Sequence, residues 1–320
     1  MSNMNHTLGW IGAGRMGYPM AERLAKAGCS IRVWNRTRAK AEPLAENGAS
    51  IVDGVGELGD VDILFTMVST GKDLKQVLFG DGGAATGAGG ARPKIIVDCS
   101  SVGSDESGEV RDQLEGLGIG YIASPVSGNR KAVKAGVLST VTSGPKEAFE
   151  TVRPYLETIA PRGVAYVGEG ELSRFCKIAH NVMLGVVIQN LSEITVLAEK
   201  AGVPRHAFLN FINDSVMGSP FTRYKSNALA NLDWTTTFTP PLLLKDMDLG
   251  LAEARALGVS MPGAAATRQA VQHHAGRVAK IDPANLDRDF GMLIETVADG
   301  AGMTLEPENV PIPTGLEPKD

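Results

Sequence analysis

The sequence predicts an α/β protein, with a doubly wound parallel sheet in its first half, one long connecting helix and an all-α second half. Short apolar runs alternate with helical patterns up to residue 169, which is typical of a parallel sheet covered by helices. A helical pattern then continues from 171 to 201, interrupted only by the isolated Gly185. Every periodic segment beyond it is helical. We therefore expect one domain at 1–169 and a second at 170–305.

The elements of the first half follow one another along the chain. An apolar run at 8–12 predicts a buried strand, and an amphipathic segment at 18–28 predicts a helix that ends in glycine. Further strands are predicted at 30–35, 62–68, 94–100, 119–125, 137–144 and 163–168, and further helices at 38–47, 71–79 and 104–117. Because strands and helices alternate, we expect one parallel sheet.

The second half carries only helical patterns. The long helix is expected to end at Gly202, because Pro204 follows. Further helices are predicted at 204–213, 241–257, 263–279 and 285–299. The stretch FTRYKSN at 221–227 is interpreted as a surface turn. The segment 306–320 is rich in proline and charge, which predicts a disordered tail.

Composition excludes several classes of partner. The 320 residues are 43% hydrophobic and 21% charged, with a net charge of −5, so nucleic acid and anionic membranes are not expected as partners. The cysteines Cys29, Cys99 and Cys176 have no spacing typical of a disulfide framework or a zinc site. The histidines are not at metal-ligand spacing with carboxylates. We expect reduced thiols, no metal and a cytoplasmic location.

A glycine-rich loop follows the first predicted strand. Gly12, Gly14 and Gly17 form a G-x-G-x-x-G pattern that also opens a helix, the context in which this pattern indicates a dinucleotide site. Gly12 permits a tight turn, Gly14 lets a pyrophosphate approach the backbone, and the helix N-terminus favours negative charge. The alternative is a glycine turn without a ligand. The predicted contacts from this loop and from the end of the strand at 62–68 are Gly12, Ala13, Gly14, Arg15, Met16, Met67 and Val68.

The end of the second strand bears on which dinucleotide is bound. A carboxylate there would accept hydrogen bonds from the ribose hydroxyls of NAD, but this chain has Asn35, Arg36, Thr37 and Arg38. An arginine pairs with a 2′-phosphate, which a carboxylate would repel. We therefore predict that NADP(H) is preferred over NAD(H), with Asn35, Arg36 and Thr37 in contact with it. The alternative is that the arginines are solvated surface residues.

Two loops and the long helix supply candidate residues for a substrate. Ser101 follows one strand, and Ser127 with the Gly128 N–H could bind a carboxylate, although a serine–glycine pair is also ordinary turn chemistry. Lys177, His180 and Asn181 share a helix face. A lysine among apolar residues has a lowered pKa and can exchange a proton with a hydroxyl. The alternative is a lysine whose stem packs while its ammonium reaches water.

A second lysine follows a similar pattern. Lys245 lies at an apolar helix start, and we expect it to reach back to the cofactor crevice. Asp246 beside it is interpreted either as its anchor or as a charge that stabilises the helix N-terminus.

Five segments together resemble one family. They are GWIGAGRMGYPMAERLAKAG, IIVDCSS, SPVSGNRKAVKAG, KIAHN and LLLKDMDLGLAEA, and they span Leu8 to Leu257. The chain resembles the β-hydroxyacid dehydrogenases, which include 3-hydroxyisobutyrate dehydrogenase. Departures from the family pattern include Ser101 for threonine, Asn129 for a glycine that touches substrate, and His180 for the first asparagine of an N-N pair. Ala123 and Ser124 replace an aspartate and an alanine, and Ser173 replaces a glycine.

The resemblance implies a Rossmann-type first domain, a helical second domain and a homodimer or homotetramer formed through it. It implies that Lys177 is the general acid/base and that Asn181 orients the substrate. It also implies that Ser127 and Gly128 bind the substrate carboxylate. His180 and Asn129 would also contact the substrate, and Ser101 and Lys245 would lie near the cofactor. The predicted reaction interconverts a small 3-hydroxy acid and its semialdehyde or keto acid with NADP(H). Alternatives are reduction of an imine and a catalytically silent nucleotide-binding protein.

Overall fold

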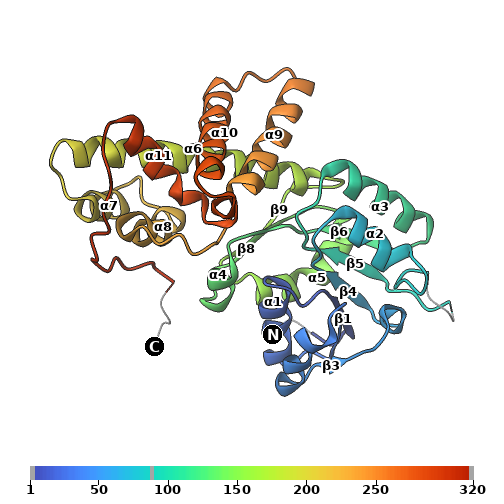
Figure 1. The fold of residues 1–320 in the computed structure, drawn as a ribbon. Helices are drawn as coiled ribbons and strands as arrows, with labels where there is room; N and C mark the ends of the chain where they lie inside the picture. The colour runs from blue at the N-terminus through green and yellow to red at the C-terminus, as the bar shows by residue number, and fades with distance from the viewer. Residues whose placement is uncertain (1–3, 87–89, 317–320) are drawn as a thin grey trace. The chain divides into compact units, whose positions relative to one another are not determined.

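The computed structural model describes residues 4–86 and 90–316, and it divides into two compact units (Figure 1). The N-terminal unit is Met1–Lys177 and the helical unit is Ile178–Asp320. The division falls after 177 rather than at the expected 169, because Ser173 and Arg174 are buried by bonds to Ala123, Asp98 and other residues of the N-terminal unit.

The N-terminal unit is built on a six-stranded parallel sheet of order β3-β2-β1-β4-β5-β6. Its strands are β1 (Leu8–Ile11), β2 (Ile31–Trp34), β3 (Ser50–Ile51), β4 (Ile63–Thr66), β5 (Ile95–Asp98) and β6 (Gly120–Ala123). The side chains of neighbouring residues in one strand belong to different hydrophobic cores, as those of Trp10 and Ile11 do. Burial on both faces explains why the strands are continuous apolar runs in the sequence. The predicted Rossmann-type fold is therefore confirmed.

Helices cover both faces of this sheet. One core contains residues of α1 (Gly17–Lys26) and α5 (Lys146–Ile159), and the other contains residues of α2 (Gly71–Phe79) and α3 (Ser104–Gly116). The helix expected at 38–47 is instead two 3-10 helices, Arg38–Lys40 and Glu42–Asn47. Pro43 explains the break, because proline lacks the N–H that a continuous helix needs. A further short 3-10 helix spans Val55–Leu58.

The last two predicted strands do not join the parallel sheet. The strands β7 (Val126–Ser127), β8 (Ser139–Thr142) and β9 (Gly163–Tyr166) form a separate sheet of order β7-β8-β9, in which β7 and β8 are antiparallel. The expectation of one sheet was therefore wrong for this part. A single bridge between Ala123 and Ser143 connects the two sheets, and the short helix α4 (Arg130–Lys134) lies between β7 and β8 in sequence.

The long predicted helix is α6 (Leu172–Lys200), which belongs to both units. The other helices are α7 (Arg205–Asp214), α8 (Pro220–Asn231), α9 (Pro240–Ala256), α10 (Pro262–Ile281) and α11 (Leu293–Gly300), with short 3-10 helices at Pro283–Asp287 and Phe290–Met292. Within the described residues, α6 alone is long and apolar enough to cross a membrane, but core helices of other proteins pass the same test, and 44% of its apolar window is buried here.

A close crossing of α6 with α9 depends on two glycines. A Cβ at Gly185 would lie 2.9 Å from the Met247 sulfur, and one at Gly250 would lie 2.2 Å from Val182. Larger residues at either position would separate the helices, because backbones approach this closely only where side chains are absent. The crossing brings the α9 segment around Asp246 against the α6 segment around Asn181.

Two expectations for the helical unit differ from the structure. FTRYKSN is part of α8 rather than a surface turn, and its Lys225 is buried in an ion pair with Asp289. The segment 306–316, expected to be disordered, makes specific contacts: Glu308 accepts hydrogen bonds from the Arg205 and His206 backbone N–H groups, at 2.8 and 2.7 Å, and Ile312 is buried. Those contacts use the free donors of the α7 N-terminus. Residues 317–320 lie outside the described part of the chain.

Candidate functional site

The glycine-rich loop joins β1 to α1 at the edge of the parallel sheet. Gly12 has φ +98°, and a Cβ there would lie 2.2 Å from the Met67 carbonyl oxygen. A Cβ at Gly17 would lie 1.9 Å from the Gly12 carbonyl oxygen, whereas one at Gly14 would meet nothing within 4 Å. The loop is therefore packed tightly at both ends and open in its middle. An open backbone before the unpaired N–H groups of a helix start fits a pyrophosphate.

Asn35 holds this loop in place. Its Oδ1 accepts a hydrogen bond from the Ala13 N–H at 2.8 Å, and its Nδ2 donates to the Thr37 carbonyl at 2.7 Å. Both polar ends of the side chain are thus bonded inside the protein. The structure gives Asn35 a role in shaping the loop that the sequence analysis did not foresee.

The two arginines after β2 differ in their surroundings. The Arg36 side chain is 86% exposed, and its nearest carboxylate is Asp73 at 3.8 Å. Arg38 is 47% exposed and pairs with Asp53 and with Glu42. A guanidinium that is mostly hydrated and only loosely paired can rearrange toward a phosphate at small cost. Arg36 is therefore the better placed of the two for a 2′-phosphate.

The ends of β4 and β5 are held together by buried polar groups. The Thr66 and Ser100 hydroxyls each donate to Asp98 Oδ1 at 2.6 Å, and the Ser100 oxygen accepts from the Val68 N–H at 2.9 Å. Met67 and Val68 are half-buried and Ser101 is exposed. Ser101, and not the fully buried Ser100, is accessible to a ligand.

Arg174, in the first turn of α6, completes this cluster. Its guanidinium donates to Asp98 Oδ2, to the Ser100 carbonyl, to the Ser107 hydroxyl at 3.1 Å and to the Tyr121 hydroxyl at 3.2 Å. Burial raises the pKa of Tyr121 above its usual value, so the phenol stays neutral. The sequence analysis missed this cluster, although an arginine at the start of an apolar helix was an available signal.

The segment after β6 contains the residues predicted to bind a substrate carboxylate. Ser127 is half-buried at the end of β7, and Gly128 is exposed with φ +134°, where a Cβ would lie 2.9 Å from both Ala132 and Leu138. Asn129 caps α4, because its Oδ1 accepts from the Ala132 N–H at 3.0 Å. The Asn129 amide nitrogen is therefore the part of this side chain that can serve a ligand.

Two of the predicted residues of α6, His180 and Asn181, form a connected group with Asp246 and Lys245 of α9. Lys177 is half-buried. One turn along, Asn181 donates to Asp246 Oδ2 at 2.7 Å, and its Oδ1 lies 2.9 Å from His180 Nδ1. Lys245 lies 3.4 Å from Asp246 Oδ1. Asp246 thus anchors both Asn181 and Lys245, and it lies beyond the first turn of α9, where a helix-dipole role is small. The predicted contact of Lys245 with the cofactor stays a prediction.

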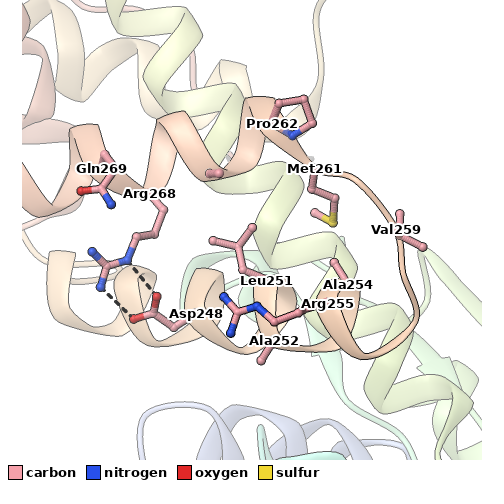
Figure 2. A pocket seen from close by; sticks show the side chains of 11 residues that line it. Asp248, Leu251, Ala252, Ala254, Arg255, Val259, Met261, Pro262, Arg268 and Gln269 are labelled. Atoms are coloured by element: carbon pink, nitrogen blue, oxygen red, sulfur yellow. Dashed lines mark hydrogen bonds and ion pairs between the residues drawn. The ribbon is translucent and has the colours of Figure 1, made fainter.

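A hollow of about 720 Å³ lies between α9 and α10 (Figure 2). Leu251, Val259 and Met261 line it, and Arg268 donates to Asp248 at 2.8 and 3.1 Å at its wall. The residues that line this hollow include none of the predicted site residues. Among residues 4–86 and 90–316, no group of three or more His, Cys, Asp or Glu could hold a metal ion.

Comparisons with known proteins cover nearly the whole chain. Residues 7–168 match the family model of the NAD-binding domain of 6-phosphogluconate dehydrogenase. Residues 171–285 match the NAD-binding domain of NADP-dependent 3-hydroxyisobutyrate dehydrogenase. Both descriptions indicate a nicotinamide cofactor.

Individual relatives agree with these matches. The chain is 30% identical to the chloroplastic glyoxylate/succinic semialdehyde reductase 2 of Arabidopsis thaliana, over 91% of this chain and 79% of the relative. It is 30% identical to the 2-hydroxy-3-oxopropionate reductase of Escherichia coli, over 82% and 89%. The solved Mycobacterium tuberculosis 3-hydroxyisobutyrate dehydrogenase with L-serine has the same fold, with a TM-score of 0.75 at 24% identity over 92% of this chain and 99% of that chain.

Proposed function

Because the chain belongs to the β-hydroxyacid dehydrogenase family, we propose that it is an NADP-dependent oxidoreductase acting on a small 3-hydroxy acid and its semialdehyde or keto acid. One observation carries the proposal. The half-buried Lys177 lies in the same compact unit as the glycine-rich loop, on a helix whose start is bonded to the ends of β5 and β6. The carboxyl ends of such strands are where ligands of doubly wound sheets bind.

The residues around the glycine-rich loop fit a dinucleotide. Gly12, Ala13, Gly14, Arg15 and Met16 would hold the pyrophosphate, since the backbone at Gly14 is open. Arg36 would pair with the 2′-phosphate that distinguishes NADP from NAD. When bound, the nicotinamide supplies or accepts a hydride.

Lys177 would move the proton that accompanies the hydride. In the reducing direction its ammonium donates a proton to the carbonyl oxygen of the substrate, and in the oxidising direction its amine removes the hydroxyl proton. A lysine can act in both directions because its ammonium is an acid and its amine is a base. Asn181, held by Asp246, would orient the substrate oxygen one turn along the helix.

The substrate carboxylate would bind in the loop after β7. The Ser127 hydroxyl, the Gly128 N–H and the Asn129 amide nitrogen offer hydrogen-bond donors without a net charge. Neutral donors suit a small substrate that carries one carboxylate. The aldehyde or keto carbon would then lie within reach of Lys177.

The assembly and the location are further parts of the proposal. Met183, Leu197, Phe211 and Met217 are large apolar side chains that are more than 60% exposed on the helical unit. Apolar surface of this kind supports a homodimer or homotetramer formed through that unit. Cys29, Cys99 and Cys176 are free thiols, which supports a cytoplasmic location.

The test is a turnover screen with both cofactors. Purified protein is assayed with 3-hydroxyisobutyrate, glycerate, serine and cyclic imines, each with the NADP and NAD couples. We expect turnover of a hydroxy acid, with the NADP couple preferred. Lys177→Ala should lower kcat by at least about 10²-fold and leave NADPH affinity nearly unchanged, because general acid–base catalysis contributes on that scale.

Other outcomes of this screen would contradict the proposal. Turnover restricted to imines would reassign the reaction, and a wild-type rate in Lys177→Ala would remove Lys177 from proton transfer. NADPH binding without oxidation or reduction of any candidate would favour a silent nucleotide-binding protein.

A further inference from the structure

We propose that Arg174 is a positioning residue, which fixes the first turn of α6, and with it Lys177, on the ends of the strands that carry the predicted cofactor contacts. This inference rests on the proposed role of Lys177 in proton transfer. It adds a residue that neither contacts the reacting atoms nor was predicted from the sequence.

The contacts of Arg174 reach three elements of the parallel sheet and its cover. Asp98 is the last residue of β5 and Ser100 lies two residues beyond it, while Tyr121 belongs to β6 and Ser107 to α3. The side chain is 1% exposed. An arginine has five donors in a planar fork, and a lysine has three donors at a single point, so only arginine can serve four separate acceptors at once.

The position of Arg174 makes these contacts matter for Lys177. The two residues are three apart, so they are neighbours on the same helix. Ser173 is also buried, and its hydroxyl donates to the Ala123 carbonyl at 2.9 Å. Phe175 and Cys176, by contrast, are exposed. Ser173 and Arg174 therefore attach this turn of α6 to the N-terminal unit, and Arg174 makes the charged contacts.

The same cluster also contacts Val68, one of the predicted cofactor contacts. Asp98 receives Arg174 on Oδ2 and the hydroxyls of Thr66 and Ser100 on Oδ1. The Ser100 oxygen in turn fixes the Val68 N–H at 2.9 Å. One buried carboxylate thus connects the helix of the proposed proton donor to the strand end of a predicted cofactor contact. Removing the arginine would leave that carboxylate without its counter-charge. The first turn of α6 and the end of β4 would then both shift.

The experiment compares Arg174→Met and Arg174→Lys with a matched control, Lys225→Met. Lys225 forms a buried ion pair with Asp289 inside the helical unit, whereas Arg174 and Lys177 belong to the N-terminal unit, so its loss removes a comparable pair from the other unit. For each protein we measure kcat and KM for the hydroxy acid, and backbone hydrogen exchange of residues 171–177 by mass spectrometry, at a temperature where the protein is folded.

We expect Arg174→Met to lower kcat by about 10²-fold with a change in KM of only about threefold, because misplacing a catalytic group by about 1 Å costs that much. Arg174→Lys should recover part of the rate. Protection of 171–177 from exchange should fall in Arg174→Met and stay as in the wild type in Lys225→Met. A loss caused by instability alone would affect the control variant equally.

Three outcomes would overturn the inference. Unchanged kcat in folded Arg174→Met would do so, and so would equal losses in the control. Failure of both Arg174 variants to fold would make the residue a requirement of the fold itself. If the wild type turns over no hydroxy acid, the proposed function fails while hydrogen exchange still decides whether Arg174 anchors this turn.

Discussion

Arg36 is mostly hydrated and only loosely paired, which separates it from Arg38 beside it. Its removal should therefore cost little stability and act on the cofactor. We expect Arg36→Ala to raise the Kd for NADPH by about 10-fold or more, since hydrogen bonds to charged groups contribute about 1.5–3 kcal/mol. The Kd for NADH should change less than about twofold, because that dinucleotide lacks the 2′-phosphate. Titration of both cofactors by fluorescence makes the comparison. Equal losses would remove Arg36 from this role.

Asn129 divides its two polar atoms between structure and a possible ligand. Asn129→Asp keeps the oxygen that caps α4, because aspartate is an equally good helix cap, but replaces the amide donor by a carboxylate oxygen. We expect KM for the hydroxy acid to rise about 10-fold with kcat little changed, because hydrogen bonds to charged groups contribute about 1.5–3 kcal/mol. Asn129→Gly, which loses the cap as well, is the comparison. An unchanged KM in Asn129→Asp would show that the amide does not touch the substrate.

The candidate residues could be predicted from sequence only where local context carries the signal. Gly12 and Lys177 stand out because each departs from its immediate surroundings. The Arg174–Asp98 pair joins residues 76 positions apart, and no local pattern relates them. The bond of Asn181 to Asp246 likewise depends on how α6 and α9 cross. Asn181 could be named from the sequence, but Arg174 and the partners of both residues required the fold.

At the scale of one element, the β1–α1 loop separates stability from binding. Gly12→Ala places a Cβ 2.2 Å from the Met67 oxygen at a φ of +98°, so this variant should lose both stability and NADPH binding. Gly14→Ala meets no atom within 4 Å, so its melting temperature should stay close to that of the wild type. We expect its Kd for NADPH to rise, because the new methyl enters the space proposed for the pyrophosphate. Thermal melts and cofactor titration of both variants test this. Wild-type affinity for NADPH in Gly14→Ala would contradict the proposed binding of the pyrophosphate at this loop.

Two segments that contain proline show the limits of predicting helices from local patterns. The α5 helix went unpredicted although Phe149, Val152, Leu156 and Ile159 have helical spacing, because Pro154 interrupts the pattern. Proline removes a single donor, and burial of one apolar face outweighs that loss. The segment at 38–47 shows the opposite case, since only 3-10 turns form around its proline.

At the scale of the whole molecule, the sequence predicted the α/β first half and the all-helical second half but not the way that strands combine. The strands β8 and β9 pair in a second sheet, although they follow the other strands in the same alternation with helices. Burial alternates along β8 and β9, whereas β1 and β4 are buried throughout, but this difference does not decide which neighbour a strand takes. The contacts of 306–316 with α7 and α8 depend on free backbone donors at a helix end, which the tail's composition does not reveal.

The stability of the helical unit should depend on pH through His274. This side chain is 1% exposed, its Nδ1 lies 2.7 Å from the Thr296 hydroxyl, and burial lowers its pKa from 6.5 to about 4. Between these values the unfolded chain binds a proton that the folded unit does not, so the free energy of unfolding should fall as pH falls from 6.5 toward 4.

The expected loss between pH 7 and pH 4.5 is about 2–3 kcal/mol, since one pKa unit corresponds to about 1.4 kcal/mol. Chemical denaturation followed by circular dichroism at several pH values measures it. The His274→Gln variant keeps a polar partner for Thr296 but has no proton to bind in this range, so its stability should vary less with pH. The carboxylates of both proteins titrate alike, so the difference between the two curves isolates His274. Parallel curves would show that the folded unit accepts the proton on His274 without cost.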